Sequence, residues 1–132
     1  MKIARLAWEK KAEDIKILDV SELAQFTDYF VLLTAEVELH SRAIADFIEQ
    51  TLKAEGIQPH HIEGRMNLQW VLLDYIDVVV HVFLPQIREF YDLESYWGEA
   101  KSVKTDFDAL LDQSAPVSTS PPLKTTRTYS RN

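Results

Sequence analysis

The chain has 132 residues, 46% of them apolar, no cysteine, and 21 acidic against 14 basic residues. This length and apolar content suit one domain with a buried core. The lack of cysteine excludes a disulfide framework, thiol chemistry and a cysteine-ligated metal.

The distribution of charge and of apolar residues limits the classes of partner that the protein is expected to bind. The acids concentrate in residues 1–112, because residues 113–132 contain three bases and no acid. An acidic body repels nucleic acid and favours a basic protein partner, although an acidic surface more often serves only solubility. No run is apolar enough to span a bilayer, and the first eight residues lack the apolar stretch of a secretory signal. We therefore expect a cytoplasmic protein that binds neither DNA nor membranes.

Four elements are predicted in the first half of the chain. Apolar residues at helical spacing predict a helix over residues 1–12, and alternation predicts a strand over 14–20. A continuous apolar run predicts a more deeply buried strand over 28–34. A second apolar stripe predicts a helix over 36–55, ended by Gly56.

The second half begins with a connector over residues 57–68, followed by two strands folded back on each other over 70–84. A helix over 85–97 is predicted next, with Pro85 in its first turn. Its core-facing stripe is expected to hold Phe90, Leu93 and Trp97. Tyr91 and Tyr96 lie off that stripe and are of a type enriched at interfaces.

The predicted domain covers residues 1–112 and ends with a short amphipathic helix over 103–111. Residues 113–132 are rich in Ser, Thr and Pro and poor in apolar residues. Such a segment cannot repay the entropy of ordering, so a disordered tail is expected. The fold class is α/β, with a mixed sheet of four or more strands and helices packed on it.

The hairpin of residues 70–84 organises the predicted fold. If Tyr75 and Ile76 are a two-residue turn, Trp70 lies opposite His81. One face is then aliphatic and belongs in a core: Val71, Leu73, Val78, Val80 and Val82. The other face, here called the mixed face, combines aromatic, aliphatic and charged side chains and is a candidate binding surface: Trp70, Leu72, Asp74, Asp77, Val79 and His81.

Two clusters of acidic and histidine residues are candidate metal sites. Asp74, Asp77 and His81 could coordinate a divalent ion or act as acid and base. Aspartates also cap turns, however, and His81 can fill a cross-strand position beside Trp70. These structural roles are favoured, because no phosphate loop or third carboxylate motif accompanies the cluster.

The second cluster, His60, His61 and Glu63, lacks a distant partner at ligand spacing. The chain has no nucleophile motif and no dinucleotide or phosphate fingerprint, and it has only three glycines. The residues alone favour an interaction module over an enzyme, with no catalytic residue, metal or cofactor.

Several strings occur together in one order and spacing: residues 10–15 with 18–20, 26–31, 62–65, 70–75, 77–83, 88–94 and 97–98. Over residues 2–101 they resemble the ribosomal silencing factor family, also called the Iojap family. The resemblance implies a nucleotidyltransferase-like α/β fold without transferase chemistry. It also implies docking on the universal ribosomal protein fourteen of the large ribosomal subunit. Docking there sterically blocks joining of the small subunit and represses translation, and family members are also linked to large-subunit assembly.

In this family the hairpin carries partner binding, at the positions of Trp70, Asp74 and Asp77. Together with the mixed face, this gives the predicted partner-binding residues: Trp70, Leu72, Asp74, Tyr75, Asp77 and His81. The chain departs from the family at two turns. Ala35, Val37 and Leu39 replace a small-residue turn, and Ile76 replaces a turn glycine. Because a β-branched residue resists positive φ, we expect a different turn at Ile76 or a longer loop with a shifted register.

Two other functions stay open. One is a nucleotide-binding or nucleotidyltransferase-like enzyme that uses Asp74 and Asp77 with a divalent metal. The other is an adaptor that forms a homodimer through the exposed hairpin when free.

Overall fold

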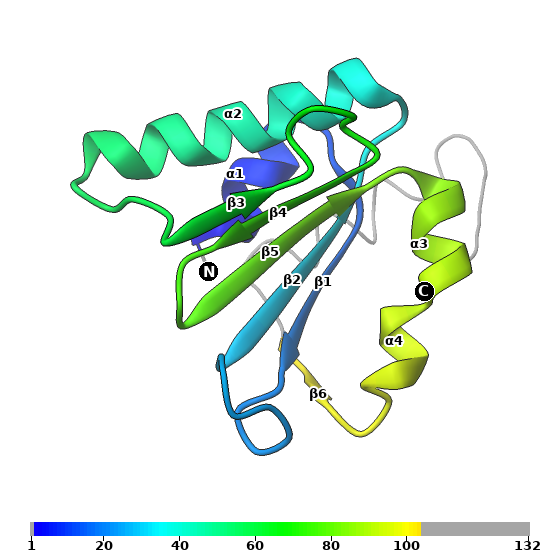
Figure 1. Cartoon of the computed structure of the whole chain (residues 1–132). Helices are drawn as coiled ribbons and strands as arrows, with labels where there is room; N and C mark the ends of the chain where they lie inside the picture. Colours follow the sequence, from blue (N-terminus) through cyan, green and yellow to red (C-terminus); the bar gives the residue numbers. More distant parts are fainter. Residues whose placement is uncertain (1, 104–132) are drawn as a thin grey trace. The chain divides into compact units, whose positions relative to one another are not determined.

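The computed structural model describes residues 2–103, which form one six-stranded sheet with helices on both faces (Figure 1). The elements follow in the order α1 (Lys2–Glu9), β1 (Glu13–Asp19), β2 (Tyr29–Thr34), α2 (Glu38–Ala54), β3 (His61–Glu63), β4 (Trp70–Asp74), β5 (Val78–Phe83), α3 (Pro85–Tyr91), α4 (Leu93–Tyr96) and β6 (Lys101–Ser102). The predicted α/β class is confirmed.

The sheet is mixed, with strand order β3-β4-β5-β2-β1-β6. Only β2 and β5 run parallel, and the other neighbouring pairs are antiparallel. The crossover from β2 to β5 passes through α2 and the β3–β4 ribbon, so the two most apolar strands lie side by side at the centre. The two edge strands were not predicted from the sequence, because three residues in β3 and two in β6 are too few to show hydrophobic alternation.

Strand alternation divides the apolar residues between two layers. One layer packs under α1 and α2 and includes Ile17, Val31, Leu33, Val71, Leu73, Val80 and Val82 (Figure 1). The second layer lies on the opposite face: Leu18, Phe30, Leu32, Val79 and Phe83 are buried there, and Ile87, Leu93 and Trp97 of the α3–α4 segment pack against them. The aliphatic face predicted for the hairpin is the first layer, and the mixed face belongs to the second.

The hairpin register differs from the predicted one by two residues. Trp70 pairs with Phe83, and His81 pairs with Leu72. The Tyr75 N–H donates to the Val78 carbonyl at 2.8 Å, so the turn is Ile76 and Asp77 rather than Tyr75 and Ile76. Moving a two-residue turn by one position shifts every pair by two, and side chains keep their faces because the period of a strand is two.

Ile76 adopts positive φ, at 75°. The expectation that this β-branched residue would avoid that region is therefore wrong, although the shifted register that it suggested is present. The Asp77 N–H donates to the Tyr75 carbonyl at 2.9 Å across Ile76, in the manner of a γ-turn. The conformation costs of order 1–3 kcal/mol, which the surrounding sheet must offset.

The helix predicted over 85–97 is divided at Asp92, whose φ is 48°. A continuous helix would place residues 88 and 94 on different sides, whereas the break allows Arg88 and Glu94 to meet. Leu93 and Trp97 contact the core as predicted, but Phe90 is exposed, so its predicted core role is wrong.

The predicted helix over 103–111 and the predicted tail over 113–132 lie outside the described residues. Among the helices of the described part, none has the length and apolarity that crossing a membrane requires.

Candidate partner-binding site

Trp70 and His81 form the centre of the mixed face. They come from neighbouring strands, β4 and β5, but each lies two residues away from the position opposite the other. The Trp70 indole Nε1–H nevertheless donates to Nδ1 of His81 at 3.1 Å, and the two ring centroids lie 5.9 Å apart. This diagonal contact fixes the orientation of a large, half-buried aromatic side chain.

His81 is only 5% exposed, so it lies beneath the surface rather than on it. Burial, assisted by the nearby Arg88 charge, lowers the pKa of His81 from 6.5 to about 4. The ring is therefore neutral at pH 7. Because Nδ1 accepts from Trp70, the ring proton resides on Nε2, which has no hydrogen-bond partner among residues 2–103.

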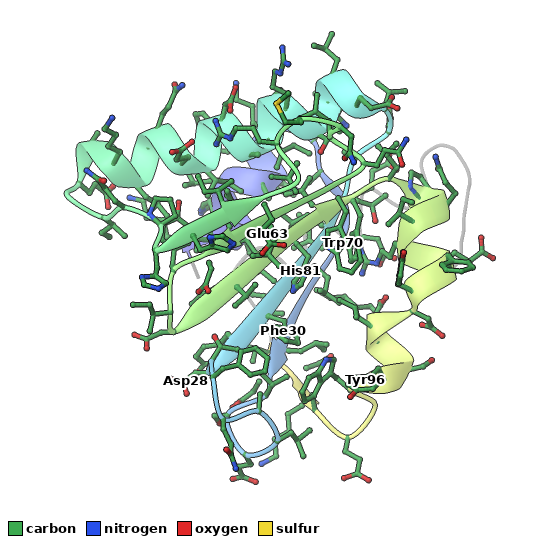
Figure 2. All side chains as sticks on the ribbon, viewed as in Figure 1. Asp28, Phe30, Glu63, Trp70, His81 and Tyr96 are labelled. Carbon is green, nitrogen blue, oxygen red and sulfur yellow. The ribbon has the colours of Figure 1, made fainter. Side chains whose placement is uncertain are left out.

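Aromatic rings continue from this pair in both directions. Trp70 lies 5.4 Å from Phe83 and 4.9 Å from Tyr91 of α3, measured between ring centroids. His81 lies 5.1 Å from Phe30 in an edge-to-face contact. Figure 2 shows Trp70, His81 and Phe30 in a row along the sheet, beside α3 and α4. Sequence reasoning missed Phe30 as part of this array, because it sits in an apolar run that reads as core.

Asp74 and Asp77 shape the turn of the hairpin. Oδ1 of Asp74 accepts the Ile76 N–H at 2.8 Å, which is the turn-capping role favoured from sequence. The carbonyl of Asp77 accepts the backbone N–H groups of Asp28 and Tyr29, each at 3.0 Å, and so joins the turn to the start of β2. The Asp77 side chain remains exposed.

Tyr75 is not brought together with the other predicted partner-binding residues. Alternation places it on the face that carries α2, where burial first and the Glu49 charge second raise its pKa to about 12. Leu72 lies on the mixed face, half-buried against the second layer. Of the six predicted residues, the structure groups Trp70, Leu72, Asp74 and His81 on one face, with Asp77 at its end.

No group of three His, Cys, Asp or Glu side chains in residues 2–103 could hold a metal ion. In the second cluster, His61 Nε2 lies 2.7 Å from Oε2 of Glu63 at the exposed sheet edge. This contact is an ordinary surface pair, which in general contributes little to stability.

Gly64 lets the chain pass close to Trp70. Its φ is 82°, and a Cβ built there would lie 1.8 Å from the Trp70 carbonyl oxygen. A side chain at this position would therefore displace the start of β4. The sequence contained no periodic signal for this contact, since Gly64 lies in the predicted connector.

Arg88 anchors α3 beneath the same face. Its guanidinium donates to both carboxylate oxygens of Glu94, at 3.1 and 3.0 Å. It also donates to the Asp14 carbonyl at 2.7 Å and to Thr34 Oγ1 at 2.8 Å, and it lies over the Phe83 ring. The side chain is 6% exposed, so these contacts satisfy a buried charge.

Comparisons with known proteins agree with one another. A family model described as ribosomal silencing factor during starvation matches residues 1–131. The ribosomal silencing factor RsfS of Bacillus subtilis is 40% identical over 108 residues, which are 81% of this chain and 92% of that protein. A crystal structure of a Bacillus halodurans protein superposes with a TM-score of 0.69 at 31% identity, covering 79% of this chain and 95% of that one.

A more distant relative is the mouse mitochondrial assembly of ribosomal large subunit protein 1. It is 30% identical over 98 residues, which are 72% of this chain and 43% of that protein.

Proposed function

Because this chain belongs to the ribosomal silencing factor family, we propose that it docks on the universal ribosomal protein fourteen of the large ribosomal subunit. Docking there blocks joining of the small subunit by steric exclusion and so represses translation. The name of the mouse relative, which refers to large-subunit assembly, supports the same subunit as the partner.

The observation that carries the proposal is the half-buried Trp70 held in place by His81. Rigid aromatic side chains that are partly exposed on an ordered strand are typical anchors of protein interfaces. In the proposed complex Trp70 and Leu72 supply apolar contact, and Asp74 and Asp77 supply negative charge. His81 acts from below as a positioning residue, since its burial keeps it from the partner.

The charge of the body suits a ribosomal protein rather than ribosomal RNA. Residues 2–103 contain 18 acids and 10 bases. Such a surface attracts basic proteins, accelerates their association and repels the phosphate backbone.

The proposed activity is binding without catalysis. Asp74, one of the two carboxylates on which an enzymatic function would depend, is engaged in capping the turn. A test for the enzyme alternative is calorimetry with nucleoside triphosphates and Mg²⁺, in which heat of binding would favour it over the proposal.

Sedimentation with purified ribosomal subunits tests the proposal directly. The protein should sediment with large subunits and not with small ones. Light scattering should then show that it prevents large and small subunits from joining, and excess free ribosomal protein fourteen should reverse this effect. Sedimentation with small subunits, or joining at an unchanged rate when large subunits are saturated, would overturn the proposal.

A further inference from the structure

Phe90 and Tyr91, at the end of α3, form an exposed aromatic pair. Phe90 is 79% and Tyr91 51% exposed. Their ring centroids lie 5.0 Å apart in an edge-to-face arrangement, so the two rings present one joined surface. Adjoining exposed aromatics are a marker of partner sites, because a protein that has no use for them gains by replacing them with polar residues.

This pair is continuous with the mixed face. The Tyr91 ring lies 4.9 Å from the ring of Trp70, which in turn is bonded to His81. Trp70 therefore contacts His81 of the hairpin and Tyr91 of the aromatic pair on α3. Any partner that covers Trp70 meets Tyr91 beside it.

The pair is also held in place before binding. Arg88, two residues before Phe90, is bound to Glu94, to the Asp14 carbonyl and to Thr34. The chain then turns at Asp92, whose N–H donates to the Arg88 carbonyl at 2.9 Å. Because these contacts hold the backbone on both sides of the pair, less conformational entropy is lost when a partner binds than on a mobile segment.

Negative charge flanks the aromatic pair. Glu89 precedes it and Asp92 follows it, and both side chains are exposed. The one base of α3 and α4, Arg88, is buried and bound to Glu94. Within residues 2–103 no base forms an ion pair with Glu89 or Asp92. Aromatic faces combined with unpaired carboxylates attract guanidinium and ammonium groups.

We propose that Phe90 and Tyr91, flanked by Glu89 and Asp92, form a subsite for an arginine or lysine side chain of the ribosomal protein that covers Trp70. This inference rests on the proposed function, because it extends the same docking surface from the hairpin onto α3. The ring faces contact the cation, and the two carboxylates supply the opposite charge.

Two variants of the full chain separate the contributions of ring and charge. Phe90→Leu keeps apolar bulk but removes the π face. The double variant Glu89→Gln with Asp92→Asn removes both charges and keeps the backbone, since asparagine tolerates the left-handed conformation of residue 92. The matched control is Leu39→Ala, because Leu39 is 71% exposed on α2, on the other face of the sheet.

Affinity for purified large subunits is measured by sedimentation at several salt concentrations, with urea unfolding as the check on folding. We expect Phe90→Leu and the charge variant each to weaken binding about fivefold or more, as loss of a cation–π contact or of interface charge does. The charge variant should also reduce the salt dependence of binding. Leu39→Ala should bind as the wild type does.

The outcomes distinguish this inference from the function on which it rests. If the wild type does not bind large subunits, the proposed function fails. If Trp70→Ala abolishes binding but both α3 variants bind normally, the subsite alone is wrong. A variant that binds subunits normally but changes the dimer content of the free protein would identify the pair as an interface between copies. Equal affinity of the wild type for protein-free ribosomal RNA would likewise overturn the proposal.

Discussion

Trp70 and His81 are hydrogen-bonded across the hairpin although neither lies opposite the other. The contact runs along the diagonal of the ladder, a distance that only a long side chain such as tryptophan spans. It links the proposed anchor, Trp70, to a buried neutral imidazole, so binding and stability can be separated by substitutions at these two positions.

Replacement of Trp70 tests the anchor. Trp70→Ala should weaken binding to large subunits by about 2 kcal/mol or more, which is the usual effect of removing a central aromatic anchor. Trp70→Phe keeps an aromatic ring but leaves His81 Nδ1 without its donor, which should lower the free energy of unfolding by about 1 kcal/mol. Sedimentation and urea unfolding provide the two measurements. Unchanged ribosome binding by a folded Trp70→Ala variant would contradict the site assignment.

Acid should destabilise the protein through His81. The unfolded chain has the ordinary histidine pKa of 6.5, and the folded chain one of about 4. Between these values only the unfolded state binds the proton, so the free energy of unfolding falls as the pH is lowered from 6.5 to 4. The loss amounts to about 3 kcal/mol by linkage.

His81→Phe should flatten the stability profile in this pH window, as followed by urea unfolding at each pH. His61→Ala is the control, because His61 is exposed at the sheet edge. An equally steep profile in both variants would assign the effect to other groups.

Arg88 and Glu94 should be needed for the α3–α4 segment to stay on the sheet. Glu94→Ala removes both carboxylate hydrogen bonds of the buried Arg88 and leaves it only the Asp14 carboxylate, 3.7 Å away, as an opposite charge, so it should cost about 3 kcal/mol of stability. Arg65→Ala breaks the exposed contacts to Glu49 and Asp46 and should cost less than about 1 kcal/mol. Denaturant unfolding distinguishes the two, and equal costs would refute the anchoring role.

Ile76 should be a position where stability can be gained. Its side chain is 57% exposed and its φ is 75°, so glycine would lose little burial and remove most of the backbone strain. We expect Ile76→Gly to raise the free energy of unfolding by about 1 kcal/mol, whereas Ile76→Ala, which keeps a Cβ, should not. Thermal unfolding of both variants measures the difference. A stabilised alanine variant would show that strain at this residue is not the cause.

Local patterns predicted the parts of the fold that depend on period. The alternation in residues 70–84 assigned Val71 and Trp70 to the correct faces even though the pairing was two residues out. The face of a side chain depends only on whether its position in the strand is odd or even. The register depends on the turn, where Ile76 adopts a conformation that its residue type disfavours.

Features set by distant contacts were not predictable in this way. The break at Asp92 allows Arg88 and Glu94 to meet, and no periodic signal in residues 85–97 indicates it. Phe90, which precedes the break, is exposed instead of buried. At the candidate site, the neighbourhood of Trp70 and His81 was anticipated, but the burial of His81 depends on Phe30 and α3, which the hairpin alone does not reveal.

The sheet ends in very short strands on both sides, with three residues in β3 and two in β6. At the β3 edge, a strand of this length offers few free backbone groups to another molecule, and it carries His61 and Glu63 as exposed polar side chains. That edge of the sheet is thus poorly suited to growing by strand addition. A dimer that formed at the β3 edge would have to use side chains rather than a continuous intermolecular sheet.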